Sequence, residues 1–245
     1  MLAVTAHPDD EAAVFGGSLR LYNDRGVETS VICLTPGQAA SHRGNTRDDR
    51  ELSALRRKEF ADSCAILKVG RSAVLDYPDG QLHRIDMHRA VADLVQHIRE
   101  FRPQIVLSMG PEGAITGHTD HSMASVFATL AFHWAGRNNR CPDQLANGLH
   151  PHRAQKLYYA TASAALPGRQ PISFAPVTAR IEIGSCLEAK TAAFHAHQTQ
   201  APVFAIFDAY AAKLGNPELF NLAASVVSGA ASMETDLFAG VTDDH

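Results

Sequence analysis

The sequence has few cysteines, no strong excess of either charge and no long apolar run. Its four cysteines lie far apart without a C-x-x-C pair, so neither a disulfide framework nor a thiolate zinc site is suggested. A net charge of -4 gives no basic excess of the kind that marks nucleic-acid binding. No segment approaches about 18 uninterrupted apolar residues, which argues against membrane insertion.

The remaining composition is that of a globular protein. Hydrophobic residues make up 45% of the 245 residues, enough to build a well-buried core. The apolar stretch at residues 1–6 is too short for a signal peptide and has no charged region before it. We therefore expect a single cytoplasmic domain over residues 1–245 with a small-molecule partner, and the sequence leaves a homo-oligomer open.

Short apolar runs alternate with longer helical patterns in the first half, which is typical of βαβ units. The runs that predict strands are 1–6, 27–35, 72–76 and 104–109. Between them, residues 11–25, 50–68 and 86–101 carry apolar side chains at helical spacing. The fold class predicted is α/β, with a Rossmann-like, mostly parallel sheet flanked by helices.

The second half predicts additional strands and helices at the C-terminal end. A helix is expected over 120–135, an excursion loop over 136–153, strands at 156–162 and 177–183, a helix at 188–197 and further helical material over 204–239. The loop at 36–47, rich in Gly, Ser, Asn and Ala, follows the second strand. Sheet ligands usually bind near such loops, so this one is either a mobile lid or a plain solvated loop.

The first strand ends in Ala6-His7-Pro8-Asp9-Asp10-Glu11. This places an imidazole and adjacent carboxylates at the carboxyl edge of the sheet, where open α/β folds bind ligands. Asp10 alone would serve to cap the next helix. Capping, however, explains neither His7 nor the second aspartate.

The fourth strand leads into Gly117-His118-Thr119-Asp120-His121, again just before a helix. If the first and fourth strands are neighbours, both clusters converge at one edge. Catalytic zinc takes three protein ligands from His and Asp or Glu, with one position left open. A His-Asp-His set drawn from the two clusters meets this description and leaves other histidines and aspartates to move protons.

These two motifs together resemble the PIG-L/LmbE-like family of metal-dependent N-deacetylases. The resemblance assigns His7, Asp10 and His121 as ligands of Zn²⁺. It also implies that Asp9 is the general base, and that His118, oriented by Asp120, is a general acid or oxyanion stabiliser. Because His and carboxylate ligands also suit Fe²⁺, Co²⁺ and Mn²⁺, the metal stays open.

Other segments resemble the family in matching order: Arg56-x-x-Glu59, Pro78-Asp79-Gly80 and the stretch 190–200. By this resemblance Arg56 and Asp79 contact substrate. Each also has a simpler interpretation, since Pro-Asp-Gly forms a turn by itself and a helical Arg with acidic neighbours commonly forms a solvated ion pair. His197 and Gln200 either line the site or belong to the core or a cap.

The second motif departs from the family at two positions. Thr116 stands where some members have a Tyr that stabilises the oxyanion, and this shifts that task to the metal and His118. Thr119 stands where Pro is commoner, and the helix start tolerates this change.

Three functions fit these residues. The first is removal of an acetyl group from an N-acetylglucosamine-type conjugate, with Asp9 taking the proton of the attacking water and His118 protonating the departing amine. The second is an amidase of a larger acylated conjugate with the same centre. The third is a non-catalytic Rossmann-like metal-binding module, although the absence of G-x-G-x-x-G after the first strand argues against dinucleotide binding.

Overall fold

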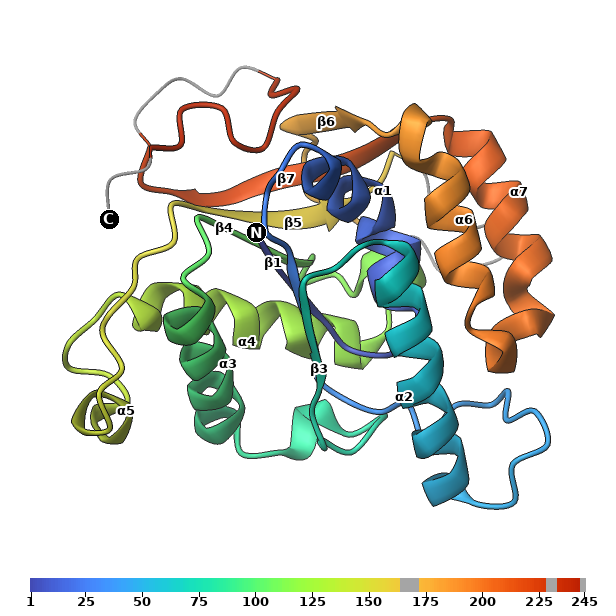
Figure 1. The fold of residues 1–245 in the computed structure, drawn as a ribbon, viewed down its shortest axis with the longest axis horizontal. Helices are drawn as coiled ribbons and strands as arrows, with labels where there is room; N and C mark the ends of the chain where they lie inside the picture. Colours follow the sequence, from blue (N-terminus) through green and yellow to red (C-terminus); the bar gives the residue numbers. More distant parts are fainter. Residues whose placement is uncertain (164–171, 228–232, 243–245) are drawn as a thin grey trace.

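The computed structural model describes residues 1–163, 172–227 and 233–242. The described strands form one seven-stranded sheet of order β3-β2-β1-β4-β5-β7-β6 (Figure 1). The strands are β1 Leu2–Thr5, β2 Ser30–Cys33, β3 Arg71–Val74, β4 Ile105–Met109, β5 Lys156–Thr161, β6 Ala179–Glu182 and β7 Pro217–Ser225. The first five pair in parallel, and β7 is antiparallel to both β5 and β6. The predicted α/β fold with a mostly parallel sheet is confirmed.

Helices cover both faces of this sheet. They are α1 Asp10–Asp24, α2 Asp49–Ile66, α3 Met87–Phe101, α4 Thr119–Ala135, α5 Pro142–Ala146, α6 Leu187–His195 and α7 Phe204–Leu214, with 3-10 helices at Leu82–Arg84, Ala114–Thr116, Gly184–Cys186 and Gln198–Val203. In Figure 1, α3 and α4 lie together on one side of the sheet, and α1, α2, α6 and α7 lie on the other.

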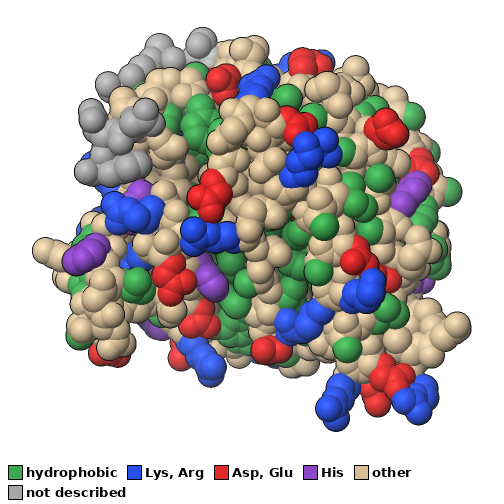
Figure 2. All heavy atoms as spheres, in the orientation of Figure 1, with side chains coloured by type: hydrophobic (Ala, Val, Ile, Leu, Met, Phe, Trp, Pro, Cys, Tyr) green, Lys and Arg blue, Asp and Glu red, His purple; other side chains and the backbone are tan. Residues whose placement is uncertain are grey.

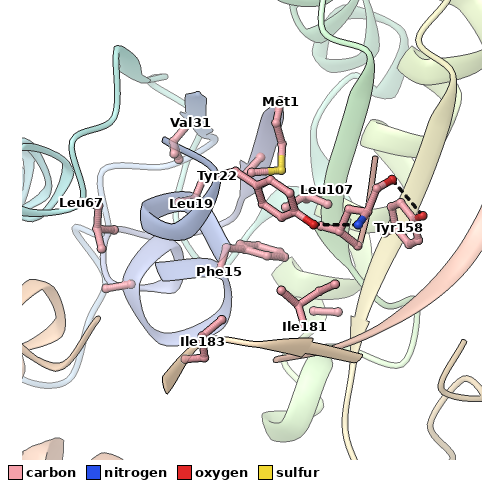
Figure 3. Close-up of a cluster of buried hydrophobic side chains, with 14 of the residues drawn as sticks. Met1, Phe15, Leu19, Tyr22, Val31, Leu67, Leu107, Tyr158, Ile181 and Ile183 are labelled. Atoms are coloured by element: carbon pink, nitrogen blue, oxygen red, sulfur yellow. Dashed lines mark hydrogen bonds between the residues drawn. The ribbon is translucent and has the colours of Figure 1, made fainter. Parts of the chain in front are cut away.

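Alternating side chains of the strands build two separate cores. Leu2 and Val4 of β1 pack with the apolar faces of α3 and α4, whereas Ala3 packs with α1. This alternation follows from the two-residue period of a strand. On the α1 side, Phe15, Leu19 and Tyr22 meet Tyr158 and Ile181 from the far half of the chain (Figure 3).

The C-terminal prediction of helix over 204–239 is wrong beyond Leu214. Gly215 takes a φ of +76° and Pro217 follows, and both residues stop a helix. The chain then forms β7, which lies between β5 and β6 and pairs with both. Its Glu218 and Phe220 are buried. Residues 228–232 of this prediction lie outside the described residues. The expected excursion loop also differs, because it contains the short helix α5.

The surface in the orientation of Figure 1 carries charges of both signs. Figure 2 shows Lys and Arg interspersed with Asp and Glu, and no region of this face that gathers one sign. Across the part of the chain that the structure describes, no helix is both long and apolar enough to cross a bilayer.

Candidate metal-dependent active site

The two motifs meet because their strands are neighbours. β1 pairs in parallel with β4, with Leu2 opposite Val106. Both strands end at the same carboxyl edge of the sheet. The backbone continues from β1 to His7, and from β4 to the turn before α4. The convergence expected from the sequence therefore follows from the strand order.

Donor atoms of three side chains converge at this edge. Nδ1 of His7 lies 3.3 Å from Nε2 of His121 and 3.5 Å from a carboxylate oxygen of Asp10, and that Nε2 lies 3.2 Å from the other oxygen of Asp10. Tetrahedral Zn²⁺ with bonds of about 2.1 Å separates its ligand atoms by about 3.4 Å. The spacing of His7, Asp10 and His121 therefore fits one metal ion, and all three side chains are largely buried.

The opposite side of each imidazole has a partner that orients it. Nδ1 of His121 lies 3.2 Å from the Gly113 carbonyl, which accepts a hydrogen bond from it and leaves Nε2 for the metal. The Thr116 hydroxyl lies 3.4 Å from the same Nδ1. Nε2 of His7 lies 3.0 Å from Asp79 and 3.4 Å from Asp120. Carbonyl and carboxylate partners of this kind fix the tautomer of a metal-binding histidine.

These contacts revise the expected role of Asp120. Its carboxylate accepts hydrogen bonds from the backbone N–H groups of Gly80 and Leu82, at 2.7 and 3.1 Å, and faces His7. Among the described residues, no hydrogen bond joins this carboxylate to His118. Instead, the backbone N–H of Asp120 donates to Nδ1 of His118 at 3.1 Å. The reason is helix geometry, since His118 is the N-cap of α4 and its side chain accepts from the first turn.

Asp79 is also engaged inside the protein. Its carboxylate contacts His7 and accepts a hydrogen bond from the N–H of Ala39 at 2.9 Å, and the residue is buried. The turn interpretation is therefore incomplete, because the side chain takes part in the site. A substrate contact for Asp79 stays a prediction.

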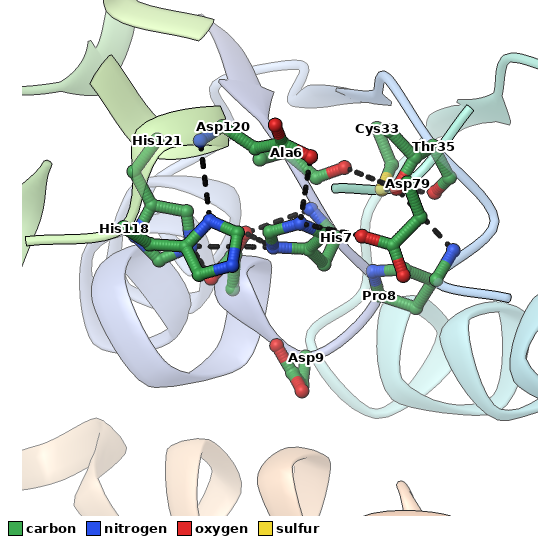
Figure 4. Close-up of polar contacts among 12 residues, drawn as sticks. Ala6, His7, Pro8, Asp9, Cys33, Thr35, Asp79, His118, Asp120 and His121 are labelled. Carbon is green, nitrogen blue, oxygen red and sulfur yellow. Dashed lines mark hydrogen bonds and ion pairs between the residues drawn. The ribbon is translucent and has the colours of Figure 1, made fainter. Parts of the chain in front are cut away.

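His118 is the exposed imidazole of the cluster. Its ring centroid lies 4.8 Å from that of His7 (Figure 4), and donor atoms of His7, His118 and His121 lie within 4.8 Å of one another. Because Nδ1 accepts a hydrogen bond, the neutral ring carries its proton on Nε2. Partial burial and the neighbouring histidines His7 and His121 lower the pKa of His118, which favours this neutral form.

Asp9 occupies a strained position before α1 and contacts α2 through Arg56. Its φ of 113° lies in the left-handed region, which non-glycine residues rarely adopt. Its carboxylate pairs with Arg56 at 2.8 Å, and Figure 4 shows its side chain apart from the three imidazoles. Burial raises the pKa of Asp9 to about 6, with Arg56 opposing and Asp10 adding to the rise.

Arg56 is buried, and both terminal nitrogens of its guanidinium bind groups within the protein. Besides Asp9, its guanidinium donates to the carbonyls of Pro8 and Gly37. The solvated ion pair considered from the sequence is therefore wrong, since only 3% of this side chain is exposed. The Gly37 contact also ties the start of the 36–47 loop to the site.

A buried network behind Asp9 was missed in the sequence. Glu11 accepts hydrogen bonds from the N–H of Asp9 at 3.0 Å and from the Ser63 hydroxyl at 2.5 Å, and it pairs with His197 at 2.7 Å. The side chains of Glu11 and His197 are fully buried, so His197 belongs to the core. Gln200 is buried as well and donates to Thr199. The sequence signal for this network was Glu11, the last residue of the first motif.

Comparison with known proteins identifies the family. The family model described as GlcNAc-PI de-N-acetylase, PIG-L, matches residues 2–132. Diacetylchitobiose deacetylase of Thermococcus kodakarensis is 30% identical over 203 residues, which cover 82% of this chain and 70% of that protein. A 1D-myo-inositol 2-acetamido-2-deoxy-alpha-D-glucopyranoside deacetylase of Catenulispora acidiphila is 28% identical and is covered over 97% of its length by 98% of this chain.

A solved structure supports the fold. N,N'-diacetylchitobiose deacetylase from Pyrococcus horikoshii superposes with a TM-score of 0.75 at 22% identity, covering 90% of this chain and 82% of that one. At this identity the likeness concerns the fold alone. Taken with the family model, which spans both motifs of the site, the similarities show that this chain belongs to the PIG-L family.

Proposed function

We propose that this protein is a metal-dependent hydrolase that removes the N-acetyl group from an N-acetylglucosamine-type conjugate. The observation that carries the proposal is the triangle of His7, Asp10 and His121, whose donor atoms have tetrahedral spacing. The ring of His118 lies next to that of His7, with their centroids 4.8 Å apart. Named relatives act on diacetylchitobiose and on an inositol conjugate of acetylated glucosamine, which supports this class of substrate.

The metal assigned to the triangle is Zn²⁺, with Fe²⁺ as the alternative. A divalent ion held there supplies Lewis-acid polarisation of the amide carbonyl and activation of water. The chain holds its two imidazoles in the correct tautomers through Gly113, Asp79 and Asp120. Elemental analysis of the purified protein, followed by reconstitution of the stripped protein with single metals, identifies the ion.

Asp9 is the proposed general base. Its carboxylate is held by Arg56 and its backbone N–H by Glu11, which together keep it in the left-handed conformation. Of the two sequence-based roles for Arg56, positioning of Asp9 accounts for its contacts better than a direct substrate contact. A carboxylate with a raised pKa and fixed orientation suits acceptance of a proton from water.

His118 is proposed to stabilise the oxyanion. Its neutral ring carries a proton on Nε2 and is therefore a hydrogen-bond donor, and the residue is exposed. Of the two roles implied by the resemblance, this geometry favours oxyanion stabilisation over general acid catalysis. A general acid would need a second proton on Nδ1, which already accepts from the backbone N–H of Asp120. The departing amine therefore takes up the proton that Asp9 removed from the attacking water, so that the hydrolysis balances.

The test replaces Asp9 with Asn and measures metal content and acetate release on one preparation. Loss of the general base lowers kcat by roughly 10²- to 10⁴-fold while metal binding persists. Asp48→Asn is the matched control, because Asp48 caps α2 and Asn is an equally good cap. A metal-loaded Asp9→Asn protein with the turnover of the control would refute the assignment. Wild-type protein that releases no acetate from any N-acetylglucosamine conjugate would refute the function.

A further inference from the structure

A cavity lies at the end of β5, lined in part by segments that also carry residues of the candidate metal site. It has a volume of about 100 Å³ and lies against the end of β5, the first turns of α1, and α7. Two of its lining segments are close in the chain to residues of the metal site. Ala13 and Val14 follow Asp10 within one turn of α1, and Glu112, Ala114 and Ile115 flank the Gly113 carbonyl that orients His121.

The cavity wall contains one cation, and that cation is neutralised. Lys190 pairs with Glu218 at 2.5 Å, and both residues are buried. Glu218 also accepts hydrogen bonds from the N–H groups of Gly17 and Ser18 in α1, at 2.9 and 2.8 Å. This pair therefore supports the wall and offers no free charge to a ligand.

Glu112 is different because one oxygen of its carboxylate has no hydrogen-bond partner among the described residues. Its Oε1 is buried, and none of the described residues provides a hydrogen-bond partner for it. A buried acceptor without a partner is costly unless a ligand or water supplies a donor. Burial also raises the pKa of Glu112, as expected for a carboxylate without a cationic partner.

The carboxylate of Glu112 lies directly against Gly110. A Cβ added at Gly110 would lie 2.1 Å from Oε2 and 2.2 Å from Oε1 of Glu112, so the side chain folds over a position that only glycine leaves open. The location of the carboxylate is thus set by the backbone at the end of β4, and Gly110 offers a way to displace it without removing its charge.

We propose that this cavity receives the group attached to the N-acetylated sugar, and that Glu112 accepts a hydrogen bond from a hydroxyl or ammonium of that group. This inference rests on the proposed deacetylase function. The cavity has room for several water-sized groups, which suits the hydroxyl-bearing edge of a second ring. Because its unpaired charge is negative, the site selects neutral or cationic conjugates and disfavours those carrying a phosphate or carboxylate there.

The experiment compares kcat/KM for acetate release by metal-loaded protein on three probes. N-acetylglucosamine has no attached group, N,N'-diacetylchitobiose has a neutral one and N-acetylglucosamine 1-phosphate has an anionic one. We expect wild type to favour the neutral disaccharide over the phosphate by roughly 10- to 100-fold. In Glu112→Gln, which keeps an acceptor oxygen, the phosphate should gain roughly tenfold while the disaccharide changes by less than about threefold.

Two further variants separate position from charge. Gly110→Ala should displace the carboxylate and lower kcat/KM for the disaccharide, with little change for N-acetylglucosamine. Glu28→Gln changes an exposed glutamate two residues before β2; it is the matched control and should leave all ratios unchanged. Thermal melts and metal content confirm that each variant is folded and loaded.

The outcomes distinguish this inference from the proposed function. If wild type releases acetate from N-acetylglucosamine and Glu112→Gln keeps the wild-type ratio of disaccharide to phosphate, the cavity assignment is wrong. If wild type releases acetate from none of the probes, the result counts against the deacetylase function, which is refuted if inositol-linked N-acetylglucosamine also releases none. Calorimetric binding of the disaccharide and the phosphate then tests Glu112 directly, and identical affinities in wild type and Glu112→Gln would overturn its role.

Discussion

Replacing His197 with Leu tests the buried network that supports Asp9. Glu11 and His197 are fully buried and 2.7 Å apart, so removal of the imidazole leaves a carboxylate in the core without its cation. Breaking a buried pair in this way costs about 3–5 kcal/mol. Glu11 keeps its bonds to Ser63 and to the N–H of Asp9, which places the expected loss near the lower value, about 3 kcal/mol.

For a chain of this length, each kcal/mol lowers the melting temperature by about 2–4 °C, so His197→Leu should melt about 6–12 °C below wild type. The second variant, Glu11→Gln, removes the carboxylate charge that His197→Leu leaves without a partner. The double variant should therefore be more stable than the sum of the two single losses predicts, by at least about 1 kcal/mol. Urea unfolding of all four proteins measures this coupling, and additivity within about 0.5 kcal/mol would refute the ion-pair reasoning.

The same pair predicts a pH dependence. Burial opposes the charged form of His197, but the carboxylate of Glu11 outweighs it and the folded-state pKa is raised above 6.5. The stabilisation is fully present below pH 6.5 and is lost as the pH rises through the folded-state pKa. The stability gap between wild type and His197→Leu should be widest near pH 6 and narrow toward pH 9, and a gap that stays constant would contradict the assignment.

Three further outcomes are expected. His121→Ala should lose metal by elemental analysis, because two remaining protein ligands form a poor chelate, and full metal content would remove it from the ligand set. His118→Ala should keep its metal but lose roughly 10²-fold or more in kcat, and unchanged turnover would exclude it from the chemistry. Gly17→Ala should lower stability by about 1–3 kcal/mol because its Cβ would lie 2.4 Å from Ile183, whereas Gly16→Ala, with its nearest neighbour at 3.3 Å, should be neutral or stabilising in the same melts.

Much of the fold was predictable because its first half repeats one local pattern. Apolar runs bounded by turns predicted β1, β2, β3 and β4, and helical spacing predicted the helices between them, with boundaries that differ by a few residues. The prediction was wrong after residue 214, where an apolar, alanine-containing segment forms β7. Strand formation there depends on two neighbouring strands that the local sequence does not reveal.

The order of residues along the chain by itself determined which chemistry is present: two His and Asp clusters, each placed between a strand and a helix. Only the tertiary structure decided how these groups divide their roles, because partners such as Asp79 for His7 and His197 for Glu11 are distant in sequence. Asp120 shows the same limit at short range, since packing turns its carboxylate toward His7 while its backbone N–H holds His118. Local sequence sets the backbone position of a side chain, whereas burial and hydrogen-bond satisfaction over the whole fold decide which groups that side chain contacts.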